Sequence, residues 1–245
     1  MVINVHGGHN RIVPGASGYL DEVTEDRAVT AQVIVKLRAL GHTVYDCTDD
    51  SGRTQGQNLA NIVHACNAHA ADLDVSIHLN SGGGTGTEVL VYSDTGAAAG
   101  YAVKICAAIS ELGYRNRGVK ERKNLYVLRH TTAPALLVEC CFVDSAADAQ
   151  RFDADKMAAA IVRGITGQTA AQTGAAPAQQ TGYHVRITAS TLNVRRDHSA
   201  SSAVATQVRR GEVYTIVAEY NNGGTMWGKL KSGAGWIALK YTQCV

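Results

Sequence analysis

Two histidines and one glutamate stand where strand-like segments give way to loops or to a helix. His9 follows the strand-like run Val2–Val5 and a glycine pair, Glu22 precedes a long helical segment, and His78 ends an apolar run. Two imidazoles and one carboxylate are typical ligands of a catalytic zinc ion, which keeps a further position open for water. We therefore expect His9, Glu22 and His78 to bind Zn²⁺.

A second glutamate, Glu139, lies between the apolar residues Leu136–Val138 and Cys140–Phe142. A carboxylate in such surroundings is unfavourable unless a cation or a hydrogen-bond partner lies beside it. Close to zinc-activated water, it can act as general base and then pass the proton to a leaving amine. An ion pair with a residue such as Arg129 is the alternative.

The residues alone leave the third ligand open. Glu22 near the positive end of a helix is favourable without any metal, and Glu25 and Asp26 are rival ligands. His9 on its own is as typical of an ordinary loop histidine. The Gly7-Gly8 pair before it favours the metal, because glycine allows backbone and ligand to approach closely.

Three further side chains are candidates for supporting roles around this site. We expect His6 to support the metal ligands without binding the metal. Asn80 and Arg129 are candidate hydrogen-bond donors to the oxyanion that forms when an amide is attacked.

Strands and helices alternate through residues 1–167. Apolar residues at helical spacing predict helices over about 24–40, 57–70, 97–112 and 146–165. Short apolar runs predict strands at 2–5, 43–45, 74–78, 87–92, 125–128 and 135–138. This order is typical of an α/β fold in which helices flank a twisted, mostly parallel sheet. Functional residues gather beyond the carboxyl ends of such strands, where we expect His9, His78 and Glu139.

The composition changes after Gly167. Residues 168–182 are Ala, Gln, Thr and Gly with the single proline Pro177 and no charge, which predicts a flexible linker. From 183 to 245, short apolar runs separated by turns such as 221–224 predict a small all-β barrel that binds rather than catalyses. Tyr220 and Trp227 are its candidate ligand contacts.

Bulk properties exclude several classes of protein. The chain has 245 residues and a net charge of +2, too mild for a nucleic-acid partner but compatible with an anionic bacterial wall. No apolar run approaches the roughly 20 residues that a membrane span needs. The sequence starts directly with a strand-like run, so we expect no signal peptide and synthesis in the cytoplasm. The six cysteines show no metal-binding spacing, and buried free thiols are expected.

The candidate zinc ligands and Glu139 lie in segments that resemble the motifs of a known family. Ile3–His9 with Pro14-Gly15-Ala16 and Glu22 resembles the first metal motif of zinc-dependent N-acetylmuramoyl-L-alanine amidases of the Amidase_3 type. Ser76–Asn80 resembles the second metal motif, and Leu137–Glu139 resembles the motif of the catalytic glutamate. Asn116–Lys120, followed by 125–128, is also similar to these enzymes, especially to clostridial phage endolysins. The resemblance covers residues 1 to about 167.

This resemblance implies a site and a reaction. By it, His9, Glu22 and His78 hold zinc, Glu22 is preferred over Glu25, and Glu139 is the general acid and base. The expected substrate is the amide between N-acetylmuramic acid and L-alanine in bacterial peptidoglycan. His6-Gly7 stands where many members carry Asp-Pro, which leaves the hydrogen-bond support of His9 open.

The C-terminal part resembles a bacterial SH3 (SH3b) module, a type found as a wall-binding domain in lysins. The resemblance is carried by Leu192–Arg195, Gly211-Glu212, Trp227–Leu230, Gly235–Ile237 and Tyr241. With the expected absence of a signal peptide, this resemblance implies a phage or prophage endolysin that acts at the cell wall after release. The alternatives are a catalytically inactive wall-binding protein and a zinc peptidase that cuts within the stem peptide. The sequence does not indicate an oligomeric state.

Overall fold

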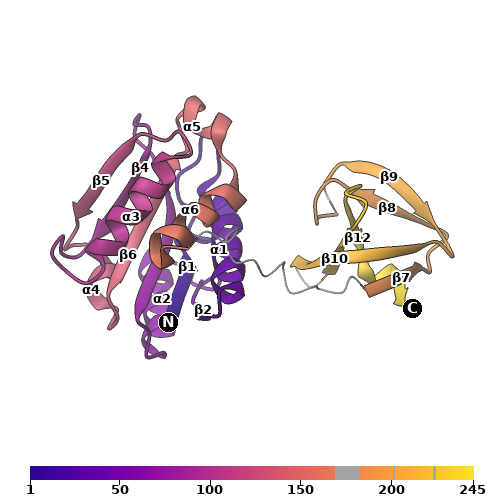
Figure 1. Cartoon of the computed structure of the whole chain (residues 1–245), viewed down its shortest axis with the longest axis horizontal. Coiled ribbons are helices and arrows are strands. Elements are labelled where there is room, and N and C mark those ends of the chain that lie inside the picture. Colours follow the sequence, from indigo (N-terminus) through magenta and orange to yellow (C-terminus); the bar gives the residue numbers. More distant parts are fainter. Residues whose placement is uncertain (169–182, 201, 223–224) are drawn as a thin grey trace. The chain divides into compact units, whose positions relative to one another are not determined.

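The computed structural model describes residues 1–168, 183–200, 202–222 and 225–245 (Figure 1). The chain divides into two compact units, Met1–Gly174 and Ala175–Val245, and each has a hydrophobic core of its own. The predicted linker, 168–182, lies outside the described residues except for Gln168, and so do two residues of the predicted turn at 221–224.

The N-terminal unit is built on a six-stranded sheet with the order β2-β1-β3-β6-β4-β5. The strands are β1 Val2–Gly7, β2 Thr43–Asp46, β3 Leu73–Asn80, β4 Thr87–Val91, β5 Asn116–Glu121 and β6 Ala135–Phe142. Neighbouring strands are parallel except for β4 and β6, which are antiparallel. The mostly parallel sheet of the prediction is thus a mixed sheet in which β4 and β5 run against the other four strands.

Helices cover both faces of this sheet. Three of them lie side by side on one face: α1 Glu22–Ala39, α3 Ala99–Ser110 and α6 Ala154–Thr166 (Figure 1). Their apolar sides and alternate strand residues, such as Val75, Ile77 and Val138, form the main core. The other face meets two helices that pack on each other, α2 Gln55–Asn67 and α4 Tyr126–His130. The short helix α5 Ala146–Arg151 follows β6.

The sheet face toward α2 and α4 carries buried polar residues. Successive strand residues point to opposite faces, so Asn4 and His6 of β1 and Asp74 and Ser76 of β3 lie opposite the main core, all of them buried. The Asn4 amide donates a 2.7 Å hydrogen bond to the Asp74 carboxylate. The alternation continues along β3 and places His78 on the same polar face.

Three sequence-based element assignments need correction. The run 125–128, predicted as a strand, belongs mostly to helix α4, because so short an apolar run cannot distinguish a strand from a buried helix. The helix predicted over 146–165 is two helices, since Asp153 begins α6 by accepting hydrogen bonds from the Asp155 and Lys156 amides. The polar segment of β5 was not predicted as a strand.

The C-terminal unit is an all-β unit of antiparallel strands in the order β13-β7-β10-β11-β12-β8-β9. The strands are β7 Tyr183–Ile187, β8 Thr191–Arg195, β9 Val204–Arg209, β10 Val213–Asn222, β11 Thr225–Leu230, β12 Trp236–Ala238 and β13 Thr242–Cys244. The 3₁₀ turn η1 Leu239–Tyr241 joins the last two. The core of the C-terminal unit includes Val185, Val194 and Ile237, all fully buried. The all-β prediction is confirmed, and the SH3b-type barrel stays a prediction.

Two further sequence expectations concern cysteines and membranes. The five cysteines whose side chains are described, Cys47, Cys66, Cys106, Cys140 and Cys141, are buried free thiols, as expected. Within the described ranges, none of the helices combines the length and the hydrophobicity that crossing a membrane requires.

Candidate active site

The structure brings His9, Glu22 and His78 together, with their candidate ligand atoms within 4.8 Å of one another. His78 Nδ1 lies 3.0 Å from Glu22 Oε1, and His9 Nε2 lies 3.8 Å from Glu22 Oε2. The two imidazole rings meet edge to face, with centroids 5.4 Å apart. Two nitrogens and one carboxylate converging in this way are a donor set that suits a zinc ion.

Glu22 is held in place by backbone groups from two segments. It is the first residue of α1, where Asp21 caps the helix by accepting from the Thr24 amide. The Ala16 amide donates to Glu22 Oε2 over 2.7 Å, and the Leu79 amide donates to Oε1 over 3.2 Å. Burial is the largest single effect and favours the neutral acid, but the hydrogen bond and charge of His78, the Ala16 amide and His9 together outweigh it and lower the pKa of Glu22. The carboxylate is therefore fixed and ionised.

The two rival carboxylates do not join this group. Asp26 is fully buried, where its carboxylate accepts from the Gly8 amide over 3.2 Å and from the Arg27 guanidinium over 2.7 Å. Burial raises the pKa of Asp26 to about 7 against the opposing effect of Arg27. Burial likewise raises the pKa of Glu25. Among the described residues, the group that can hold a metal contains neither of them.

Two glycines make room for the three candidate ligands. A Cβ on Gly8 would overlap the His78 ring, 2.5 Å from Nδ1 and closer still to Cε1. A Cβ on Gly15 would lie 2.6 Å from His9 Cδ2 and closer still to Glu22 Oε2. Neither glycine has a positive φ, so both are needed for space rather than for backbone conformation. Any side chain at these positions would push the candidate ligands apart.

Glu139 lies on β6 directly opposite His78 on β3. Paired residues of neighbouring strands point to the same face, so Glu139 stands on the polar face beside the three candidate ligands. Burial raises the pKa of Glu139 to about 7, although the nearby His78 acts against this. Its Oε2 atom is buried and has no hydrogen-bond partner among the described residues. An ionisable oxygen without a partner, next to a zinc-type donor set, fits a role toward a metal and its water.

The supporting residues of the prediction fall in different places. His6 is fully buried, with Nδ1 3.1 Å from the Gly7 carbonyl and Nε2 without a partner in the described parts of the chain. Burial lowers the pKa of His6 to about 3, so this ring is neutral. Asn80 lies two residues beyond His78 and donates to Glu88 over 3.1 Å. Arg129 instead lines a hollow with Pro134 and other residues at the start of β6, so the structure does not bring it to the three candidate ligands.

Sequence reasoning missed two charged residues, which lie on β4 and β5, the two strands beyond β6 in the sheet. Glu88 on β4 pairs with Glu139 and is buried. Arg117 on β5 donates from Nε to Glu88 over 2.8 Å. The sequence signal for Glu88 was a carboxylate within the apolar run 87–92. Arg117 was contained in a motif that had been noted only for its resemblance.

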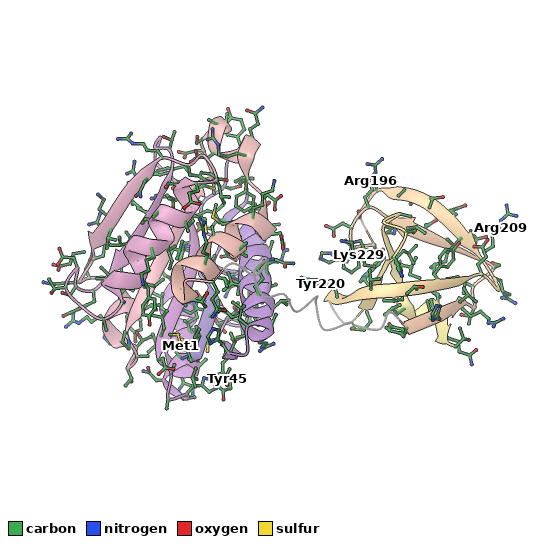
Figure 2. All side chains as sticks on the ribbon, in the orientation of Figure 1. Met1, Tyr45, Arg196, Arg209, Tyr220 and Lys229 are labelled. Atoms are coloured by element: carbon green, nitrogen blue, oxygen red, sulfur yellow. The ribbon has the colours of Figure 1, made fainter. Side chains whose placement is uncertain are left out.

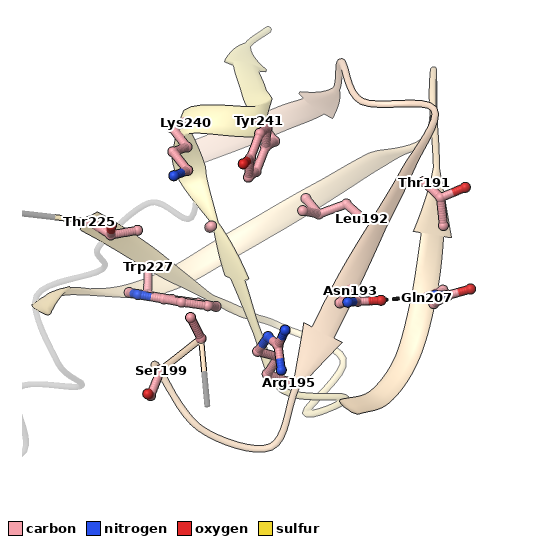
Figure 3. Close-up of a pocket in the computed structure, with 12 residues that line it drawn as sticks. Thr191, Leu192, Asn193, Arg195, Ser199, Gln207, Thr225, Trp227, Lys240 and Tyr241 are labelled. Carbon is pink, nitrogen blue, oxygen red and sulfur yellow. Dashed lines mark hydrogen bonds between the residues drawn. The ribbon is translucent and has the colours of Figure 1, made fainter. Parts of the chain in front are cut away.

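The C-terminal unit contains a groove of about 770 Å³ (Figure 3). Trp227, Tyr241 and Lys240 line it, and Asn193 faces Gln207 there across a 2.9 Å hydrogen bond. The remaining lining residues are Thr191, Leu192, Arg195, Ser199, Ala200, Thr225 and Ala238.

The structure separates the two predicted ligand contacts of this unit. Trp227 lines the groove and is itself largely buried. Tyr220, labelled in Figure 2, is exposed and contacts His198 with ring centroids 3.7 Å apart and the ring planes tilted by 47°. It is not among the residues that line the groove.

The fold and the site of the N-terminal unit define a class: an α/β domain with a His–Glu–His group beside a half-buried glutamate on a central strand of a mixed sheet. Residues 1–167 match the N-acetylmuramoyl-L-alanine amidase family Amidase_3. The chain therefore belongs to this family.

Individual relatives agree with this assignment. A sporulation-specific N-acetylmuramoyl-L-alanine amidase of Bacillus subtilis is 32% identical over 209 residues, which are 83% of this chain and 80% of that protein. An uncharacterised protein of Clostridium perfringens is 38% identical over 154 residues, and the match covers 60% of this chain but only 45% of the relative. Among solved structures, the catalytic domain of the CD27L endolysin, which targets Clostridium difficile, superposes with a TM-score of 0.64 at 26% identity. That match covers 69% of this chain and 98% of the endolysin domain.

Proposed function

We propose that this chain is a zinc-dependent N-acetylmuramoyl-L-alanine amidase. It hydrolyses the amide between the lactyl group of N-acetylmuramic acid and the L-alanine of the stem peptide. The observation that carries the proposal is the convergence of His9, Glu22 and His78 beside Glu139 in a chain of the Amidase_3 family. His9, Glu22 and His78 would hold the zinc ion. A bound zinc ion supplies Lewis-acid chemistry, polarising the amide carbonyl and making water acidic enough to react near neutral pH.

Glu139 moves the proton in this reaction. Burial raises the pKa of Glu139 and so favours proton uptake, and a carboxyl group beside the reacting atoms can act first as base and then as acid. As water attacks the carbonyl carbon, Glu139 accepts the proton. It then donates that proton to the nitrogen of the departing alanine, and the C–N bond breaks.

The other residues of the site hold this arrangement rather than react. The Ala16 and Leu79 amides orient Glu22, and Gly8 and Gly15 leave space for the two rings. His6 is a neutral, buried ring on the same polar face. We propose no role for Arg129 in the reaction.

We further propose that the C-terminal unit binds the cell wall and that the whole chain acts as an endolysin. The groove beside Trp227, Tyr241 and Lys240 supports a ligand site, because it combines aromatic surface with a positive charge. Binding through this unit would raise the local concentration of substrate at the catalytic unit. The likeness to the CD27L endolysin domain supports the endolysin reading.

Product analysis of digested peptidoglycan tests the proposed reaction. Purified walls of several bacterial species are incubated with the whole chain, and the newly exposed groups are labelled and identified. We expect new N-terminal L-alanine without new reducing sugar ends. New amino termini on other stem residues would instead identify a peptidase, and wall binding without any new ends would identify an inactive binding protein.

A further inference from the structure

The motif Asn116-Arg117-Gly118 builds a bulge at the start of β5. Thr87 pairs with Asn116 and Val89 pairs with Val119, so Glu88 faces two residues, Arg117 and Gly118. Gly118 has φ +77, a conformation that glycine adopts without strain. Asn116 Oδ1 accepts from the Gly118 amide over 2.8 Å and closes the turn. Bulges of this kind re-aim side chains and often lie next to active sites.

A second bulge, on β6, places the Phe142 ring against Arg117. His78 pairs with Glu139 and Asn80 pairs with Phe142, so β6 contains one extra residue between these pairs. Without it, strict alternation would send Glu139 and Phe142 to opposite faces. Because of it, Phe142 lies on the face of Glu139, and the Arg117 guanidinium stacks 4.9 Å above the Phe142 ring.

The two bulges leave one edge of the guanidinium available to a ligand. Arg117 uses Nε for its 2.8 Å bond to Glu88, and among the described residues Nη1 and Nη2 have no hydrogen-bond partner. The side chain is 31% exposed, whereas the Glu88 side chain is 9% exposed. A guanidinium fixed by an aromatic face and an ion pair, with two parallel N–H groups unused, is suited to a carboxylate.

The position of Arg117 in the sheet gives the approximate distance between its guanidinium and the bond that is cut. His78, Glu139, Glu88 and Arg117 follow one another across four neighbouring strands. At the usual strand spacing, Arg117 lies about 10 Å from Glu139, roughly the length of two or three extended residues. We propose that Arg117 binds a carboxylate of the stem peptide, carried by one of the first residues after the amide that is cut. This inference rests on the proposed amidase function and adds a specificity-determining residue to it.

Two muramoyl peptides that differ at one group test this proposal. In both, L-alanine is followed by a glutamate linked through its side chain, with a free α-carboxylate in one and the corresponding amide in the other. We expect the whole zinc-loaded chain to cleave the carboxylate form with a kcat/KM about tenfold higher. Arg117→Gln should lose that preference: its kcat/KM should fall by about tenfold for the carboxylate form and by less than twofold for the amide form.

Controls separate recognition from structural support. Arg122→Gln removes a charge from an exposed position just after β5 and should keep the preference. Arg117→Lys keeps the charge beside Glu88 but lacks the two-pronged donor, so it should lose most of the preference even if Arg117→Gln does not fold. An equal fall for both peptides in Arg117→Gln, or no preference in the unchanged chain, would overturn the proposal. If the unchanged chain cleaves neither peptide nor intact wall, the proposed amidase function itself has failed.

Discussion

The substitution Gly8→Ala tests whether the tight packing around His78 is needed for the site. The new Cβ would lie 2.5 Å from His78 Nδ1, whereas ordinary contacts begin at 3.4 Å. Because Cε1 lies closer still, the ring must move by more than about 1 Å, and a shift of about 1 Å near reacting groups already costs about 100-fold in rate, or about 2.7 kcal/mol. We expect zinc affinity and wall lysis both to fall by at least that factor. Because Gly8 has no positive φ, the effect is steric.

Zinc content after dialysis and the rate of turbidity loss of a wall suspension measure this effect. Gly56→Ala is the matched control, since Gly56 lies in α2 with open space around its Cβ position. We expect this control to keep its zinc and its rate. A Gly8→Ala variant that folds, retains zinc and lyses walls within twofold of the unchanged rate would refute the packing argument.

Three further predictions concern stability and wall binding. Burial raises the pKa of Asp74 to about 6, so the stability that this group contributes at pH 3.8 and below is lost as the pH rises to 6. Asp74→Asn, which resembles the neutral acid, should therefore stabilise the chain by roughly 3 kcal/mol at pH 8 but little at pH 4, measured by urea unfolding; equal effects at both pH values would contradict this. Asp21→Ala removes the cap of α1 and should lower the free energy of unfolding by about 1 kcal/mol in the same assay, and no change would contradict the capping role. Tyr241→Ser in the groove should reduce co-sedimentation with walls severalfold, whereas Tyr45→Ser, at an exposed position of the other unit (Figure 2), should not; equal binding by both would remove the groove from wall binding.

The sequence was most informative about residues that follow strands. His9 and His78 could be placed because each lies at or just past the end of an apolar run, and the carboxyl ends of parallel strands lie on one side of the sheet. Glu22 could not be separated from Glu25 by local pattern, because both occupy the first turn of α1. The resemblance favoured Glu22, which in the structure is the carboxylate that faces the two rings.

What sequence reasoning missed depends on register. Arg117 and Phe142 meet because each of β5 and β6 contains one extra residue, and a period-two pattern does not reveal where a bulge falls. The antiparallel direction of β4 was also missed, because an apolar run does not indicate in which direction its strand runs. Arg129 was considered as an ion-pair partner for Glu139 because a carboxylate in an apolar run needs a cation, but the helix of Arg129 lies toward the other end of β6.

The zinc content and the lytic rate of three samples test the central claim most directly: the unchanged chain, His78→Ala and Glu139→Gln. The account predicts about one zinc per chain and lysis in the unchanged chain, and loss of both in His78→Ala. It predicts that Glu139→Gln keeps its zinc and loses lysis, because proton transfer rather than metal binding is removed. Lysis by a zinc-free sample, or lysis at the unchanged rate by Glu139→Gln, would contradict the account.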